Sequence, residues 1–146
     1  MPLKNIIMEK VIVDIYYTGN NFCAYAPILP GCVSTAARLS EIKKNIKEAI
    51  EFHVESSIED NSPIPEIFKG EYLLEFKIST EALLNAYSEI FTKAALSRIT
   101  GINERQLWHY ASGMRKPRPA QRKRIEDGLH RLGAELLTIG IQRSLF

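Results

Sequence analysis

Positive charge gathers in one third of this 146-residue sequence. Residues 92–131 contain ten Lys or Arg and three acids, a net charge of +7, although the whole chain carries only +2. The remaining residues therefore carry −5. Clustered guanidinium and ammonium groups bind phosphates, so the segment is typical of a module that binds a polyanion such as DNA. The alternative interpretation is a basic face that contacts only solvent.

The stretch TGINERQLWHYASGMRKPRP, residues 100–119, sets these cations behind a short apolar segment. Gly101 and Gly113 lie twelve residues apart, an interval that fits one helix of about two and a half turns between two turns of the chain. Asn103 is placed to cap this helix, and Gln106 follows three residues later as in a capping box. The spacing predicts a helix over 103–112 with a cationic loop after it.

Helical spacing also flanks this stretch on both sides. We expect helices over 80–91, over 93–100 with Thr92 as cap, and from Pro119 to about residue 136. Residues 79–146 are thus predicted to form an all-α domain of four or five helices. Two sets of apolar residues are expected to face its core: Ile102, Leu107 and Tyr110, and a stripe of Ile125, Leu129, Leu132 and Leu136.

The first half of the sequence changes between strand and helix periods. Alternating residues predict a hairpin of residues 10–18 and 22 to about 28, a short strand over 32–35, and a strand over 72–78. A helix is expected from Ser40, which would cap it, to a break at residues 60–65. The order β-β-β-α-β over residues 1–78 predicts a small, antiparallel-type sheet with one covering helix, so the whole chain is expected to be α+β.

The hairpin, the segment ILPGCVSTA and the helix with KEAIEFHVE resemble the N-terminal domain of HicB-type antitoxins. The resemblance implies a partial, non-catalytic RNase H-like fold that binds a small mRNA-cleaving toxin of the HicA type. The residues that contact such a toxin are expected among the exposed members of one short group: Tyr25, Pro27, Leu29, Pro30 and Cys32.

Residues 80–136 resemble the helix-turn-helix of the Cro and phage-repressor (XRE) family in their glycines, apolar positions and trailing Gly-x-Arg-Lys-Pro. The resemblance makes 103–112 the recognition helix, bound in the major groove of operator DNA. It places four residues against base edges: Glu104, Arg105, Gln106 and His109. It places seven at phosphates: Thr92, Lys93, Asn103, Arg115, Lys116, Arg118 and Arg122. Trp108 is expected to serve packing.

Several functions find little support in the sequence. A two-metal nuclease needs several carboxylates around its ions, whereas the first strand offers only Asp14. Cys23 and Cys32 lack two further ligands for a structural zinc site, and we expect no cofactor. No apolar stretch is long enough to span a membrane, and residues 1–10 are too short and too charged for a secretory signal, so we expect a cytoplasmic protein.

Two regulatory functions remain open. The favoured one is an antitoxin that neutralises a HicA-like toxin and represses its own operon. The alternative is a stand-alone repressor whose N-terminal domain dimerises or senses a ligand; an enzyme is a distant third. Because repressors of this type read two half-sites, a homodimer or higher even oligomer is expected. The last helix, the apolar tail LLTIGIQRSLF and an exposed strand of the sheet are the candidate interfaces.

Overall fold

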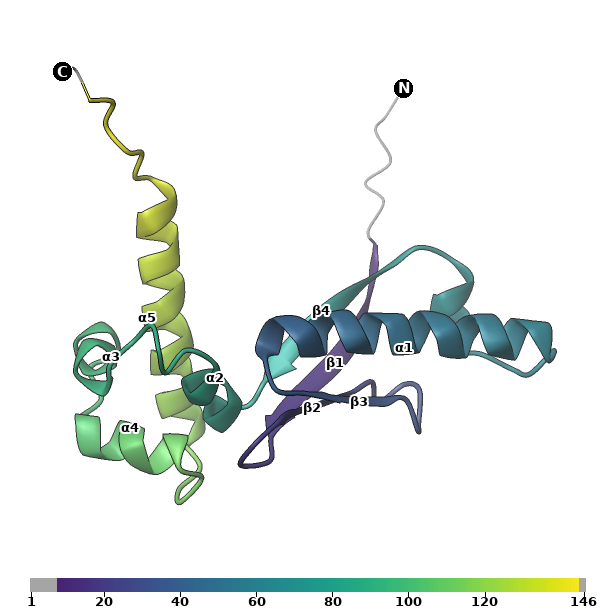
Figure 1. The fold of residues 1–146 in the computed structure, drawn as a ribbon, viewed down its shortest axis with the longest axis horizontal. Coiled ribbons are helices and arrows are strands. Elements are labelled where there is room, and N and C mark those ends of the chain that lie inside the picture. Colours follow the sequence, from purple (N-terminus) through teal and green to yellow (C-terminus); the bar gives the residue numbers. More distant parts are fainter. Residues whose placement is uncertain (1–7, 145–146) are drawn as a thin grey trace. The chain divides into compact units, whose positions relative to one another are not determined.

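The computed structural model describes residues 8–144 of the chain. Residues 1–7 and 145–146 lie outside that range. The first group belongs to the segment 1–10, for which no secretory signal was expected, and the second ends the apolar tail. The chain divides into two compact units, residues 1–86 and residues 87–146. We describe each unit by itself (Figure 1).

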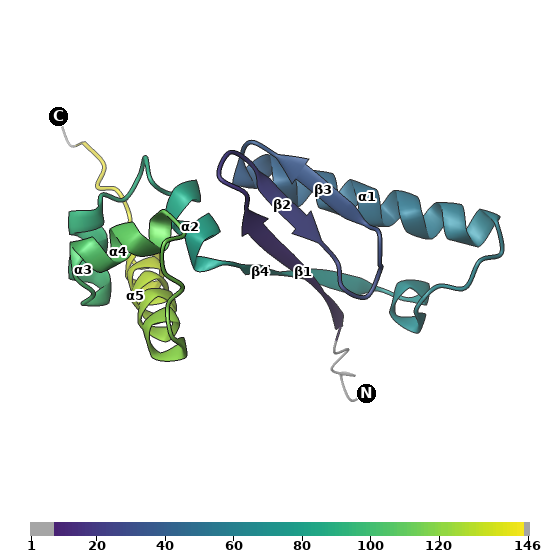
Figure 2. The same ribbon diagram turned by 90° about the horizontal axis from the view of Figure 1, so that it is seen from below.

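The first unit is built on a four-stranded sheet with the strand order β3-β2-β1-β4 (Figure 2). The strands are β1 (Glu9–Tyr17), β2 (Phe22–Tyr25), β3 (Val33–Ala36) and β4 (Tyr72–Ile78). β1 pairs antiparallel with β2, and β2 with β3, but β1 and β4 run parallel. The expected antiparallel-type sheet is therefore wrong for β4. Parallel neighbours need a long crossover, and the helix between β3 and β4 supplies it.

The helix α1 (Leu39–Glu59) covers one face of this sheet (Figure 2). Alternate residues of β1, including Val13 and Ile15, meet an apolar stripe of α1 that includes Ile42, Ile46 and Ile50 in one buried cluster. Their spacing of two along the strand and of four along the helix is what directs them to a shared core. The predicted α+β character of the chain is confirmed.

Three details of the first unit differ from the sequence-based expectations. Ser40 does not cap α1, because Arg38 is extended and its carbonyl already accepts the first helical bond, from the Ile42 N–H. β2 ends at Tyr25, since tight turns begin at Ala26, whose carbonyl accepts from the Leu29 N–H. A short 3-10 helix, η1 (Glu66–Lys69), precedes β4 and was not expected.

The helix expected over 80–91 is shorter in the structure. It forms α2 (Thr80–Ala86) and packs against β1, so the first compact unit extends past residue 78. A separate turn follows, in which the carbonyl of Tyr87 accepts bonds from the N–H groups of Ile90 and Phe91. The bond from Ile90 spans only three residues, so it closes a turn that is tighter than an α-helical one.

The second unit contains α3 (Lys93–Thr100), α4 (Glu104–Ala111) and α5 (Pro119–Leu137), close to their predicted bounds. Both α4 and α5 pack on or beside α3. The buried residues include Ile102, Leu107 and Tyr110, as expected. The predicted stripe of α5 is only partly correct, because Ile125 is buried whereas Leu136, in the last turns of α5, is 57% exposed.

A glycine sets the approach of α5 to α3. Gly128 is buried, and a Cβ atom added there would lie 2.8 Å from the carbonyl oxygen of Ile99. That same oxygen accepts a 3.2 Å hydrogen bond from Nη2 of Arg131. The close packing of these two helices therefore depends on the absence of a side chain at residue 128.

Candidate functional sites

Helices α3 and α4 each begin with a side-chain cap. Oγ1 of Thr92 accepts a 3.0 Å bond from the Ala95 N–H at the start of α3. Oδ1 of Asn103 accepts a 2.8 Å bond from the Gln106 N–H at the start of α4. Both predicted caps are confirmed. Each satisfies a backbone donor that the first turn of a helix leaves without a partner.

The three-residue turn between α3 and α4 has a fixed conformation. Gly101 adopts the left-handed region with φ of 76°, as its position predicted. The buried hydroxyl of Thr100 donates to the Leu96 carbonyl at 2.7 Å and accepts from the Ile102 N–H at 3.2 Å. Sequence reasoning missed this hydroxyl, although a threonine directly before a helix-ending glycine was the available signal. The turn thus fixes where α4 starts.

The exposed face of α4 holds only part of the expected base-reading set. Glu104 and Arg105 are exposed. Gln106 is half-buried, and its Nε2 donates a 2.9 Å bond to the Tyr110 hydroxyl instead of returning to the cap. His109 is half-buried, and its Nδ1 is buried without a hydrogen-bond partner in the described part of the chain. Glu104 and Arg105 are therefore the most exposed members of this set.

Trp108 shares the outer face of α4 and is 60% exposed. Its ring lies over a buried lysine, since Nζ of Lys93 is 4.5 Å from the ring centroid. Burial lowers the pKa of the Lys93 ammonium group below its ordinary value. Lys93 was expected at a DNA phosphate, and in the described chain its ammonium group contacts the Trp108 indole. Trp108 packs, as expected, while keeping much of its surface open.

The remaining cations expected at phosphates follow α4. Four of them are exposed, and none forms an ion pair with any residue between 8 and 144. They are Arg115, Lys116, Arg118 and Arg122. Thr92 and Asn103 are also exposed, although their side-chain oxygens already serve the two caps.

The residues guessed to contact a partner protein divide between surface and core. Pro27 and Pro30 are exposed and Tyr25 is half-buried, whereas Leu29 and Cys32 are 4% and 5% exposed. The last two belong to the core beneath α1. Burial raises the pKa of the Cys32 thiol, as expected for a group removed from water. Leu29 and Cys32 are therefore removed from the candidate contact surface.

A larger apolar surface was missed by the sequence analysis. We call it the open sheet face, the side of the sheet opposite α1, and its exposed apolar members are Ile12, Tyr16, Val33 and Leu73. Tyr16 stacks on Tyr25 with ring centroids 5.8 Å apart and planes 9° from parallel. The available signal was the outward register of β1, in which Ile12 and Tyr16 stand where an ordinary solvent-facing strand carries polar residues.

Between residues 8 and 144, no group of three or more His, Cys, Asp or Glu side chains is placed to hold a metal ion. Within the same range no helix has the length and hydropathy needed to cross a bilayer.

The first unit matches a known protein family. A family model described as the HicB-like antitoxin of bacterial toxin-antitoxin systems matches residues 11–84. This span begins in β1 and ends in α2, so it includes β2, β3, α1 and β4. The match ends before α3.

Two curated relatives are similar to part of the chain. An uncharacterised 14.9 kDa protein from the rep-hol intergenic region of Haemophilus phage HP1 is 40% identical over 63 residues, which cover 43% of this chain and 42% of the phage protein. A UPF0150 protein of Synechocystis is 35% identical over 60 residues, which cover 41% of this chain and 68% of that protein. The chain thus spans less than half the length of the phage relative. Since the family match over residues 11–84 takes in half of the sequence, the chain belongs to the HicB-like antitoxin family of bacterial toxin-antitoxin systems.

Proposed function

We propose that the chain is the antitoxin of a type II pair, which neutralises a HicA-like, mRNA-cleaving toxin by direct binding. The observation that carries this proposal is the family match, because it covers the sheet and the helix of the first unit. Family membership also favours a non-catalytic, regulatory role. In this proposal, neutralisation is a binding event that needs no chemistry by the antitoxin. A partner that cleaves mRNA implies that the antitoxin acts in the cytoplasm.

The open sheet face is the surface that we assign to the toxin. Monomeric proteins rarely leave a large apolar patch uncovered unless it binds something. The face has the stacked Tyr16 and Tyr25 on its two central strands, and Val33 at 53% exposure is paired with Tyr25 on β3. Pro27 and Pro30, which follow β2, are also exposed, and we include them in the assigned surface. The charge of −5 outside residues 92–131 favours a basic partner.

Purification of the chain together with the small protein encoded beside it tests this binding. We expect the two to elute as one complex in fixed ratio. Val33→Glu should weaken the complex by about tenfold or more, because a carboxylate buried against an apolar surface loses its hydration. Ile58→Glu is the matched control, since Ile58 is 58% exposed but lies on α1. Equal binding by both variants would move the toxin site off the open sheet face.

We further propose that α3, the turn at 101–103 and α4 form a helix-turn-helix of the XRE type that represses the operon. Several features support this proposal: the two capped helices, the left-handed Gly101 between them, and the exposed Arg105 on the outer face of α4. The free cations after α4 would hold the phosphate backbone while α4 enters the major groove. Binding of two half-sites would require a homodimer or higher even oligomer.

Gel-shift titration with the DNA upstream of the operon tests the repressor half separately. We expect binding that prefers this DNA over a scrambled duplex and that weakens with salt, as phosphate contacts require. No preference at any salt concentration would reject operator recognition but leave toxin binding untouched. If the operator binds and no toxin does, the chain acts as a stand-alone repressor, and the open sheet face becomes a dimer or ligand surface.

A further inference from the structure

β4 is an edge strand with unusual capacity to pair. It lies at one end of the strand order and pairs with β1 over seven consecutive residues, from Tyr72 to Ile78. It contains no proline and no glycine, and its register with β1 shows no bulge. The opposite edge, β3, has only four residues. Proteins often protect long edges with such breaks. None of them occurs in β4, and no further strand within residues 8–144 pairs with its outer side.

The backbone of β4 presents alternate residues to this outer edge. The N–H of Ser79 donates a 2.9 Å bond to the carbonyl of Ile15 in β1. Because successive residues of a strand point their N–H and C=O groups to opposite sides, Leu73, Glu75 and Lys77 also bond toward β1. The backbone groups of Tyr72, Leu74 and Phe76 therefore point outward.

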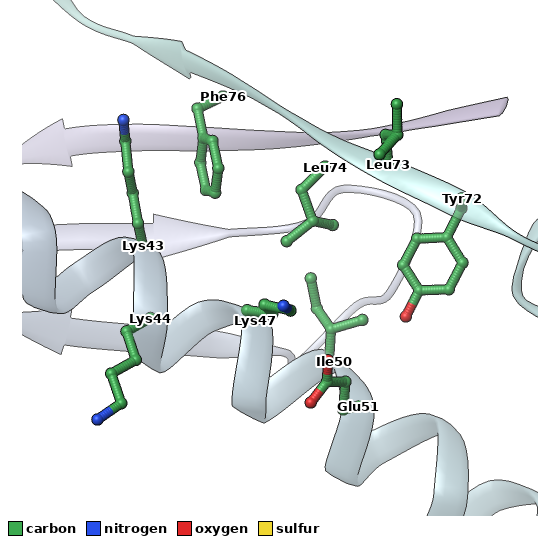
Figure 3. Close-up of a pocket in the computed structure, with 9 residues that line it drawn as sticks. All are labelled: Lys43, Lys44, Lys47, Ile50, Glu51, Tyr72, Leu73, Leu74 and Phe76. Atoms are coloured by element: carbon green, nitrogen blue, oxygen red, sulfur yellow. The ribbon is translucent and has the colours of Figure 1, made fainter. Parts of the chain in front are cut away.

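The side chains of these outward-facing residues lie on the α1 side of the sheet. Tyr72, Leu74 and Phe76 line a groove of about 530 Å³ between α1 and β4 (Figure 3). At one end, Nζ of Lys43 lies 5.2 Å from the centroid of the Phe76 ring. At the other end, Glu51 is close enough to Tyr72 to add to the rise in its pKa that burial causes. All three strand residues remain half-buried.

We propose that β4 pairs antiparallel with β4 of a second copy, across a two-fold axis at Leu74. The pairing joins the two four-stranded sheets into one. Leu74 then faces Leu74 of the second copy, and Tyr72 faces Phe76 of the second copy on each side of the axis. All three pairs use the outward backbone groups, so each is a hydrogen-bonded pair of the new ladder.

The side-chain chemistry of this register is complementary. It produces two aromatic pairs around a central leucine pair, and such cross-strand pairs stabilise a sheet. On the open sheet face, Glu71 lies opposite Lys77 of the second copy, again twice. Lys43 lies beside Phe76, and Glu51 lies beside Tyr72. Because Phe76 faces Tyr72 of the second copy, Lys43 of one copy is brought toward Glu51 of the other, and these two charges have opposite signs.

Neighbouring registers fail on particular residues. If one strand shifted by one position, residues with outward-facing backbone groups would lie opposite residues whose backbone groups already bond to β1. Those pairs could not form hydrogen bonds. An axis at Glu75 opposes two glutamates, and an axis at Leu73 opposes Glu71 to Glu75 twice, which like charges disfavour. An axis at Phe76 requires Tyr72 to pair with Thr80, the first residue of α2. Of the registers compared, the axis at Leu74 is the one that pairs outward-facing backbone groups without opposing like charges.

Disulfide trapping in the full chain tests the pairing and its register. Glu71 and Lys77 are exposed, so cysteines there leave the core intact. In one strand they lie six residues apart, about 20 Å at the usual rise, beyond the roughly 7 Å between Cα atoms that a disulfide spans. The variant Glu71→Cys/Lys77→Cys should form a covalent dimer under mild oxidation. Neither single variant should, because each cysteine then faces the unsubstituted residue.

We expect the double variant to cross-link at least about tenfold faster than either single variant, since only its thiols meet within bonding distance. Cys23 and Cys32 occur in all three proteins, so any cross-linking through them contributes equally to the three rates. Adding Leu74→Lys to the double variant should slow cross-linking, whereas Leu73→Lys, on the other face and opposite Glu75, should not.

Equal rates for single and double variants, or equal slowing by the two lysines, would overturn the proposal. The test uses neither toxin nor DNA, so its failure is separate from failure of the proposed function.

Discussion

The ammonium group of Lys93 lies 4.5 Å from the centroid of the Trp108 ring, joining the first residue of α3 to the exposed face of α4. Lys93 is only 7% exposed, and burial lowers its pKa. A positive charge over an indole face is attracted by the electron density of the ring. The contact therefore helps to fix α4 on α3 and orients a large aromatic side chain beside Arg105.

A double-mutant cycle measures this contact. Lys93→Met keeps the apolar stem and removes the charge, and Trp108→Leu removes the ring. We expect a coupling free energy of about 0.5–2 kcal/mol between the two changes, the range for exposed to desolvated cation–π pairs. Denaturant unfolding of the four proteins supplies the values. Additive effects of the two substitutions would show that the charge and the ring do not stabilise one another.

The lowered pKa of Lys93 predicts a pH dependence of stability. Between the folded pKa and the ordinary value of 10.5, the unfolded chain binds more protons at Lys93 than the folded chain does. The free energy of unfolding should therefore rise with pH in this window. Other ionisable groups are shared with Lys93→Met, so the difference between the two proteins isolates Lys93. A difference that stays flat or falls as pH approaches 10.5 would contradict the prediction.

Two glycines of α5 should respond oppositely to the same substitution. Gly128→Ala places its methyl group 2.8 Å from the Ile99 carbonyl oxygen, so we expect a net loss of about 1–3 kcal/mol from overpacking. Gly133→Ala meets nothing within 4 Å and should gain up to about 1 kcal/mol from helix propensity. Thermal and denaturant unfolding decide the signs. Similar effects of both variants would mean that α5 does not approach α3 at Gly128.

Base contacts and phosphate contacts should separate in DNA binding. Arg105→Ala should cost about 1–3 kcal/mol on the preferred operator and relax selection at one base pair. Lys116→Ala should weaken binding to every sequence and reduce the slope of log affinity against log salt by about one unit. Titrations of both variants on operator and scrambled DNA, at several salt concentrations, give both quantities. A sequence-independent loss with Arg105→Ala would assign that residue to the backbone.

Local signals predicted much of the second unit. Thr92 and Asn103 are short polar residues before helical runs, and Gly101 follows one, so the bounds of α3 and α4 could be placed from sequence. The burial of Lys93 could not be predicted from sequence, because it depends on where the turn between α3 and α4 places Trp108. The close approach at Gly128 likewise needs a second helix, and no pattern within α5 reports it.

The sheet shows the same division. The bounds of β4 agree with the pattern of YLLEFKI, but its parallel pairing with β1 depends on how the long connection crosses the sheet. Leu29 and Cys32 were among the candidate residues for the partner surface, yet both side chains are buried in the core of the first unit. Local spacing does not show which side chains of a turn the core will enclose.

Inhibition of RNA cleavage tests the central claim most directly. The small protein encoded beside the chain would be incubated with mRNA while the chain is added in increasing amounts. The account predicts that the small protein alone cleaves mRNA and that cleavage falls to background at a fixed, near-stoichiometric ratio, with Val33→Glu requiring a large excess. Unchanged cleavage at a large excess of the unmodified chain would contradict it.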